Sequence, residues 1–82
     1  MAKVEKKYTY VLKCERDGQV YTVNERVNRA RGYGQSWFAT EAAARKALDN
    51  SVKIHTGVDW KGNVGKVVWW AIKDRNGIIE QA

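Results

Sequence analysis

The 82-residue sequence contains no proline and only one cysteine and one histidine. Because Cys14 has no second thiol to pair with, an intramolecular disulfide is excluded, and its place on the apolar side of a strand pattern predicts a small buried hydrophobe. One cysteine and one histidine cannot supply the ligand set of a structural zinc site. His55 has no partner at catalytic spacing, and the glycine-rich phosphate-loop motif is absent. We therefore expect no enzyme, no metal and no cofactor.

Long apolar runs are also missing. No stretch approaches the roughly 18 residues that a membrane span needs, and no signal peptide is visible at the N-terminus. We therefore expect a protein that is not secreted, resides in the cytoplasm, nucleoid or nucleus, and has no membrane partner. Residues 1–82 are expected to form a single domain, in which the polar and basic residues 1–7 make a flexible N-terminus.

Acidic residues are fewer than basic ones, with 9 aspartates and glutamates against 15 lysines and arginines. The resulting net charge of +6 and isoelectric point near 9.7 favour a polyanionic partner. Basic residues cluster at the N-terminus, with Lys3, Lys6 and Lys7, and in a stretch without acids that runs from residue 26 to residue 40.

The first half of the chain is typical of a β-hairpin over residues 8–27. Asp17-Gly18 is the signal of a two-residue type I′ turn, and apolar residues alternate on both sides of it. The predicted register on the apolar face pairs Cys14 with Tyr21, Leu12 with Val23, and Tyr8 with Val27. On the other face it pairs Lys13 with Thr22, Val11 with Asn24, and Thr9 with Arg26.

A helix is predicted next, because Thr40 is a good N-cap and Glu41 lies where a carboxylate favours a helix start. Alanine and leucine at helical spacing favour a helix over Glu41–Ile54 that ends at Gly57. An alternative ends the helix at Asn50 and makes Val52–Ile54 a strand. Before the helix, Ser36–Ala39 is compatible with a short strand that turns Trp37 or Phe38 inward.

After a loop over residues 57–65, the β-branched and aromatic run Val67–Lys73 predicts a strand. Asn76-Gly77 is a second type I′ turn signal, which would place Lys73 opposite Glu80. The predicted fold class is therefore α+β, a small antiparallel β-sheet with one α-helix packed across it, in the order β-β-(β)-α-β-β.

Trp69 and Trp70 are adjacent in this strand, so their side chains must point to opposite faces of the sheet. One of them enters the core under the helix. The other lies on the open face, where it is either covered by the loop 57–65 or exposed as an aromatic contact for a ligand.

The acid-free segment from Arg26 to Gln35 is the strongest candidate for a binding site. Arginine offers a planar fork of donors that suits phosphate, and a tyrosine offers a flat face to a base or sugar. We predict that nucleic acid is bound by Arg26, Arg29, Arg31, Tyr33, Gln35 and Lys13. The alternative interpretation of the segment is a solvated basic loop.

The same segment resembles the signature of the WGR domain, a nucleic-acid-binding module of poly(ADP-ribose) polymerases. Matching residues are Arg26, Arg29, Gly34 and Gln35, whereas Val27 and Asn28 occupy the tryptophan and glycine positions that name the family. The resemblance extends over roughly residues 8–74, including the Trp37-Phe38 stretch before the helix, Thr56-Gly57 with Trp60 after it, and the strand that begins at Trp69.

The WGR resemblance implies a module that contacts the DNA backbone at ends or breaks. It assigns phosphate binding to Arg29 and places Val27 where the family stacks a tryptophan on a sugar, so backbone contact is implied more strongly than end recognition. DNA is favoured over RNA as the partner, with a nucleic-acid-handling protein as a further possible partner.

Two rival interpretations remain open. Arg31-Gly32-Tyr33-Gly34 with Phe38 is similar to the third strand of an RNA recognition motif, but the tight hairpin before it leaves no space for that fold's first helix. A small inhibitor or adaptor that binds a protein partner, in general form like the phage anti-CRISPR proteins, is the alternative function.

Overall fold

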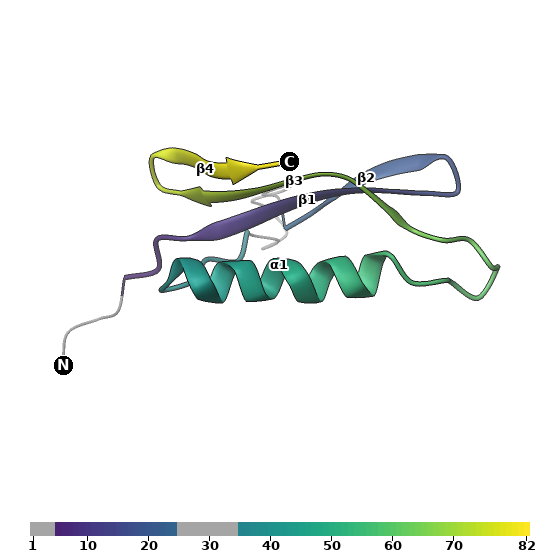
Figure 1. The fold of residues 1–82 in the computed structure, drawn as a ribbon, viewed down its shortest axis with the longest axis horizontal. Helices are drawn as coiled ribbons and strands as arrows, with labels where there is room; N and C mark the ends of the chain where they lie inside the picture. The colour runs from purple at the N-terminus through teal and green to yellow at the C-terminus, as the bar shows by residue number, and fades with distance from the viewer. Residues whose placement is uncertain (1–4, 25–34) are drawn as a thin grey trace, which may run out of the picture.

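A computed structural model describes residues 5–24 and 35–82 of the chain. Its elements are β1 (Thr9–Arg16), β2 (Gln19–Val23), α1 (Glu41–His55), β3 (Lys66–Asp74) and β4 (Gly77–Gln81). The four strands form one antiparallel sheet in the order β2-β1-β3-β4. The helix runs along one face of this sheet (Figure 1). The predicted α+β class is therefore confirmed.

The β1–β2 hairpin has the predicted turn and register. Asp17 and Gly18 both have positive φ, 53° and 74°, as a type I′ turn requires. Cys14 pairs with Tyr21, Leu12 with Val23 and Lys13 with Thr22, as predicted. Turn chemistry and apolar alternation specify the same register here, which is why a local reading of the sequence succeeds.

The hairpin ends earlier than predicted. Pairing stops at Val23, and Asn24 has a φ of 59° that turns the chain away from β1. The Asn24 side chain then donates to the carbonyl oxygen of Tyr10 at 2.8 Å. This side-chain bond takes the place of the backbone bond that a neighbouring strand would make. The predicted pairing of Val11 with Asn24 is therefore wrong.

Beyond that point the neighbour of β1 is the segment before the helix. Tyr8 forms an antiparallel bridge with Phe38, and its predicted pairing with Val27 lies outside the described residues. The predicted pairing of Thr9 with Arg26 lies outside the described residues. The optional strand over Ser36–Ala39 is reduced to this one bridge, but Phe38 packs against the core as expected.

The long helix is confirmed and the shorter alternative is wrong. Thr40 is the N-cap, and its hydroxyl accepts a hydrogen bond from the backbone N–H of Ala43 at 3.1 Å. The helix continues through Ser51 and Val52 to His55. Thr56, rather than the predicted Gly57, caps the C-terminus by donating from its backbone N–H and its hydroxyl to the carbonyl of Val52.

The β3–β4 turn differs from the prediction by one residue. Asp74 pairs with Gly77, so the turn residues are Arg75 and Asn76 rather than Asn76 and Gly77. The carboxylate of Asp74 accepts from the backbone N–H groups of Asn76 and Gly77 at 2.7 and 3.1 Å. This side-chain bonding selects the turn that the dipeptide signal alone does not identify.

An irregularity between Ile72 and Lys73 then shifts the register of β4. Lys73 pairs with Ile78, and Glu80 pairs with Ile72 instead of Lys73. Because Ile72 is fully buried in the core under the helix, Glu80 also lies on the helix side of the sheet. The bulge therefore moves one carboxylate from the open face to the helix face.

The core lies between the sheet and the helix. Its central residues are Tyr10, Leu12, Cys14, Leu48 and Ile72, and Phe38 and Trp70 are among the side chains packed against them. Cys14 is fully buried, as predicted. Within residues 5–24 and 35–82, no helix has the length and apolar character needed to cross a membrane.

Candidate nucleic-acid interface

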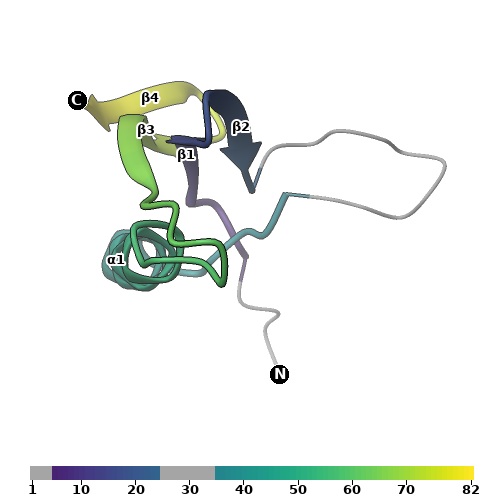
Figure 2. The same ribbon diagram turned by 90° about the vertical axis from the view of Figure 1, so that its right-hand side faces the viewer.

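The face of the sheet opposite α1 is covered by no helix of the described chain (Figure 2). Side chains alternate along each strand, so the register decides which residues share this open face. On β1 and β3 the open face carries Lys13, Glu15, Lys66, Trp69 and Lys73. Three of these side chains are positive and one is negative, which leaves the face with a net positive charge.

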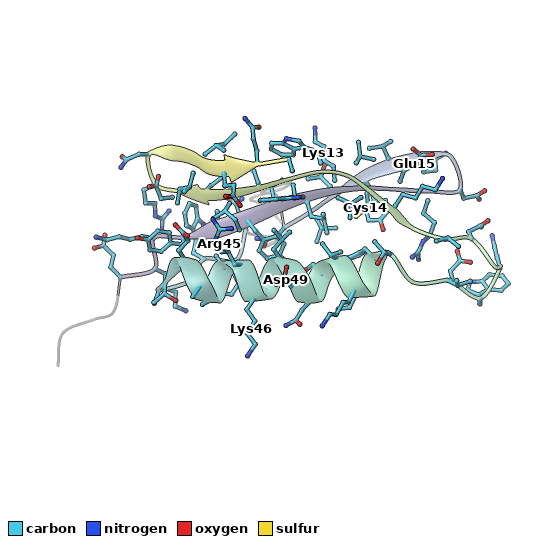
Figure 3. The ribbon with its side chains drawn as sticks, in the orientation of Figure 1. Lys13, Cys14, Glu15, Arg45, Lys46 and Asp49 are labelled. Carbon is cyan, nitrogen blue, oxygen red and sulfur yellow. The ribbon has the colours of Figure 1, made fainter. Side chains whose placement is uncertain are left out.

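The centre of the open face is Lys13 beside Trp69. Lys13 points away from the helix (Figure 3) and places its Nζ 5.7 Å from the centroid of the Trp69 ring. The indole N–H of Trp69 donates to the side-chain oxygen of Gln81 at 3.3 Å, which ties the ring to the C-terminal end of β4. A flat ring beside an exposed ammonium group is an arrangement that suits a nucleotide.

The structure distinguishes the two adjacent tryptophans. Trp70 lies on the helix side and packs against the core, whereas Trp69 lies on the open face. Both side chains are half-buried. The prediction that they point to opposite faces is confirmed, and the register assigns Trp69 as the one available to a ligand.

The two ends of the arginine-rich segment are fastened together beside β1. The backbone N–H of Ser36 donates to the side-chain oxygen of Asn24 at 2.7 Å. Thr9 donates from its hydroxyl to the carbonyl of Ser36 at 2.6 Å and accepts from the Asn24 amide at 3.2 Å. Thr9 shares the open-face side of β1 with Lys13, so these bonds between Thr9, Asn24 and Ser36 lie toward that side of the sheet.

Most of the predicted site residues lie within that segment. Arg26, Arg29, Arg31 and Tyr33 are outside the described residues. Gln35 is described and half-buried, next to the Ser36 end of the fastening. Of the predicted candidates, the structure therefore brings together Lys13 and Trp69 and leaves the arginines without a described position.

A second basic and aromatic pair was not foreseen from the sequence. The guanidinium carbon of Arg75 lies 3.7 Å from the centroid of the Trp37 ring, and one guanidinium nitrogen donates to the carbonyl of Lys6 at 3.1 Å. A stacked guanidinium keeps its other N–H donors in the plane of the group and available to phosphate. The two residues are far apart in the chain, so no local pattern reveals the pair.

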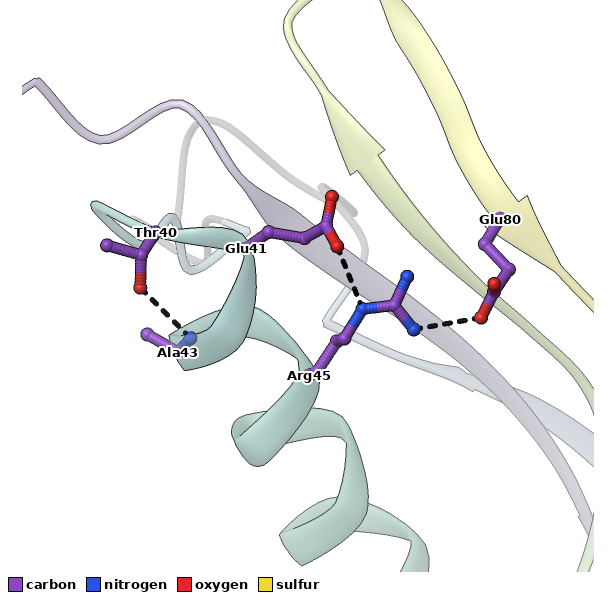
Figure 4. Close-up of polar contacts among 5 residues, drawn as sticks. All are labelled: Thr40, Glu41, Ala43, Arg45 and Glu80. Carbon is purple, nitrogen blue, oxygen red and sulfur yellow. Dashed lines mark hydrogen bonds and ion pairs between the residues drawn. The ribbon is translucent and has the colours of Figure 1, made fainter.

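The helix side of the sheet has a different electrostatic character. Arg45 donates to Glu41 at 3.0 Å and to Glu80 at 2.8 Å (Figure 4). Glu80 and then Glu41 raise the pKa of the Arg45 guanidinium further, so it stays charged. Because two carboxylates neutralise it, Arg45 is a poor partner for a polyanion.

This ion-pair group borders a groove of about 480 Å³ between α1 and the β3–β4 side of the sheet. The groove is lined by Leu48, Val52, Val67 and Trp70, with Arg45, Asp49 and Glu80 as its polar residues. Its apolar floor and paired charges suit a peptide better than a nucleic acid.

Cys14 and His55 occupy structural positions in the part of the chain that the structure describes. Burial raises the pKa of the Cys14 thiol above its ordinary value, so the thiol is neutral and a weak nucleophile at neutral pH. His55 is the last residue of α1, where its Nδ1 lies 3.0 Å from the Tyr21 hydroxyl. Among the residues that the structure describes, no three His, Cys, Asp or Glu side chains gather as metal ligands.

Comparison of the chain with protein-family models, with curated proteins and with solved structures finds no match.

Proposed function

We propose that this protein is a non-enzymatic nucleic-acid-binding module that contacts the phosphate backbone. The observation that carries the proposal is the open face of the sheet, where Lys13 lies beside the half-buried ring of Trp69. Lys66 and Lys73 share this face, so positive charge extends along β3 on both sides of the ring. A flat, basic and aromatic surface is the general form of a nucleic-acid platform.

The arginine-rich segment extends the same interface. Its ends, at Asn24 and Ser36, are fastened to Thr9 on the open-face side of β1. We infer that Arg26, Arg29 and Arg31 supply further phosphate contacts, with Tyr33 and Gln35 beside them. The WGR resemblance supports this assignment and favours DNA over RNA, and Val27 in the stacking position favours backbone contact over recognition of a terminal sugar.

Backbone contact has a characteristic salt dependence. On duplex DNA, log affinity falls with log salt with a slope of about 0.9 for each phosphate that is neutralised. Phosphate contacts carry no sequence information, so the affinity should vary little with base composition.

Fluorescence anisotropy with labelled single-stranded, blunt duplex and nicked duplex DNA, each at low and high salt, tests the proposal. The Lys13→Gln variant should weaken binding and make the salt slope shallower. Lys46→Gln removes the same charge from the outer side of α1 (Figure 3) and is the matched control. Equal affinities for the two variants, or no binding of the wild-type protein at low salt, would refute the assignment.

The groove favours a second candidate function, binding of a protein partner as an inhibitor or adaptor. Val67 is 37% exposed at its floor although it lies in a central strand. A Val67→Glu variant should then lose a co-purifying protein while keeping its affinity for DNA. Loss of DNA binding in the same variant, with no partner recovered from the wild type, would argue against this candidate.

A further inference from the structure

The most exposed aromatic side chain of the described residues is outside the sheet. Trp60, in the loop between α1 and β3, is 90% exposed, whereas Trp69 and Trp70 are half-buried. Figure 1 shows this loop at the end of the molecule beyond the C-terminus of α1. Val58 and Val64 of the same loop are also exposed, at 67% and 52%. Several apolar side chains exposed together, unlike a single one, mark an interaction site.

The loop that carries Trp60 is an ordered hairpin tip. Val58 and Val64 form an antiparallel bridge at its base. The Asp59 carboxylate accepts from the backbone N–H groups of Lys61 and Asn63, each at 2.9 Å. Backbone bonds join Asp59 to Asn63 and to Gly62, and Gly62 takes the φ of 85° that the turn needs. These bonds hold the tip in one conformation, so Trp60 is presented without a large entropic cost on binding.

The base of the hairpin is tied to the rest of the fold. Arg16, at the end of β1, donates to the carbonyls of Gly57 at 2.8 Å and His55 at 3.1 Å. Gly65 is buried and packs so closely on the His55 carbonyl that a Cβ would overlap it. The position of Trp60 is therefore set by the sheet and by the helix end together.

The charges around Trp60 indicate the class of ligand. The Nζ of Lys61 lies 5.1 Å from the centroid of the Trp60 ring, and Lys61 is exposed. Lys53 and Lys66, just before and just after the loop, are also exposed. The one carboxylate of the tip, on Asp59, is occupied by the turn N–H groups. A flat apolar face beside positive charge matches a nucleobase attached to a phosphate backbone.

We propose that Trp60 stacks on an unpaired base and that Lys61 contacts a neighbouring phosphate. The inference rests on the proposed function and adds the substrate class, because a base must leave its duplex stack to reach an exposed ring. The preferred nucleic acid is then single-stranded or carries an unpaired end. Insertion into a lipid surface is less favourable, since it would dehydrate the carboxylate of the preceding residue, Asp59, which stacking on a base does not require.

Anisotropy with a labelled thymidine oligomer of about 12 nucleotides, long enough to span a typical site, tests the proposal. Trp60→Ala should weaken binding roughly 5- to 150-fold, which corresponds to the stacking of one base. Trp60→Phe keeps a ring and should lose less, and Trp60→Leu keeps apolar area without a ring and should resemble the alanine variant. Ile54→Ala, at a 71% exposed position on the last turn of α1, is the control and should bind like wild type.

An oligomer of the same length in which abasic sites replace the thymidines separates the contribution of base stacking to the affinity from that of charge. The wild-type protein should bind it more weakly than the intact oligomer, and Trp60→Ala should lower the affinity for the intact oligomer by a larger factor than the affinity for the abasic one. If Trp60→Leu binds with wild-type affinity, or if Trp60→Ala loses the same factor in affinity on both probes, the ring does not stack on a base. Binding of anionic phosphatidylserine vesicles through Trp60, with no effect on the oligomer, would assign the tip to a membrane surface and overturn the proposal.

The two proposals fail in different ways. If the wild-type protein binds DNA and Lys13→Gln weakens it while Trp60→Ala does not, the role of Trp60 is wrong and the proposed function stands. If the wild-type protein binds none of the nucleic acids, both are wrong.

Discussion

Arg45 and Glu80 form an ion pair across the helix and the edge strand, with 2.8 Å between Nη1 and Oε1. A regular two-residue turn at Asn76-Gly77 would have put Glu80 opposite Lys73 on the other face of the sheet. The pair exists because Asp74 selects the turn Arg75-Asn76 and because the register then shifts between Ile72 and Lys73. A regular ladder from either turn would have left Glu80 on the open face, so the charge pattern of both faces depends on the register shift that follows the turn held by Asp74.

That dependence predicts the effect of Asp74→Ala. The variant loses two acceptor contacts to backbone N–H groups, and we expect a loss of about 1–2 kcal/mol in the free energy of unfolding. Urea denaturation followed by circular dichroism measures it. Asp74→Asn keeps a side-chain oxygen at the same place and should retain most of the stability; if both variants lose equal amounts, the bonding described here does not hold the turn.

The fastening of the arginine-rich segment is tested by Thr9→Val. Thr9 is fully buried, and its hydroxyl donates to Ser36 and accepts from Asn24. Valine has nearly the same shape but leaves the Ser36 carbonyl without this donor, so we expect a loss of roughly 1–3 kcal/mol in stability. Thr22→Val, at a half-buried position of the neighbouring strand, is the control.

The same variant separates stability from binding. If the fastening orients the arginines, Thr9→Val should bind DNA more weakly at a temperature where circular dichroism shows it fully folded. Unchanged affinity in the folded variant would mean that the segment binds without being oriented.

The joint between helix and hairpin predicts opposite outcomes for two glycines. A Cβ at Gly65 would overlap the carbonyl of His55, whereas a Cβ at Gly57 has its nearest neighbour at an ordinary 3.8 Å. Gly65→Ala should cost at least about 1–3 kcal/mol, as overpacking does, and Gly57→Ala should stay within about 0.5 kcal/mol of wild type. Thermal or urea unfolding of the two variants side by side measures the difference, and similar stabilities would contradict the packing at this joint.

Alkaline pH should destabilise the fold through Cys14 and Tyr21. Burial raises the pKa of both groups above their ordinary values, and the contact between them partly lowers the pKa of the Cys14 thiol while it raises the pKa of the Tyr21 hydroxyl further. A group whose pKa is higher in the folded state stabilises the fold below its unfolded pKa, and that stabilisation is lost as the pH rises through the folded pKa. The stability should therefore fall from about pH 9 upward.

Urea midpoints at a series of pH values measure this loss for wild type and for Cys14→Ala. The alanine variant is less stable at every pH but should show a shallower decline, because only Tyr21 still contributes. Parallel curves for the two proteins would show that the Cys14 thiol does not titrate differently in the folded and unfolded states.

Local chemistry determined the parts of this protein that the sequence predicts well. The type I′ signal at Asp17-Gly18 and the alternation around it specified the β1–β2 register, and the cap at Thr40 with the following helical spacing specified the start of α1. In each case the deciding residues lie within a few positions of one another. The placement of Lys13 on the open face follows from the same hairpin register.

Tertiary contacts decided the rest. The hairpin ends at Val23 because Asn24 binds Tyr10 and Ser36, and Glu80 lies on the helix side because β4 shifts against β3. The choice of Trp69 over Trp70 for the open face depends on the pairing of β3 with β1, and the exposure of Trp60 depends on a loop held at the helix end. These features arise between residues far apart in the chain, and a local pattern carries no information on which distant groups will meet.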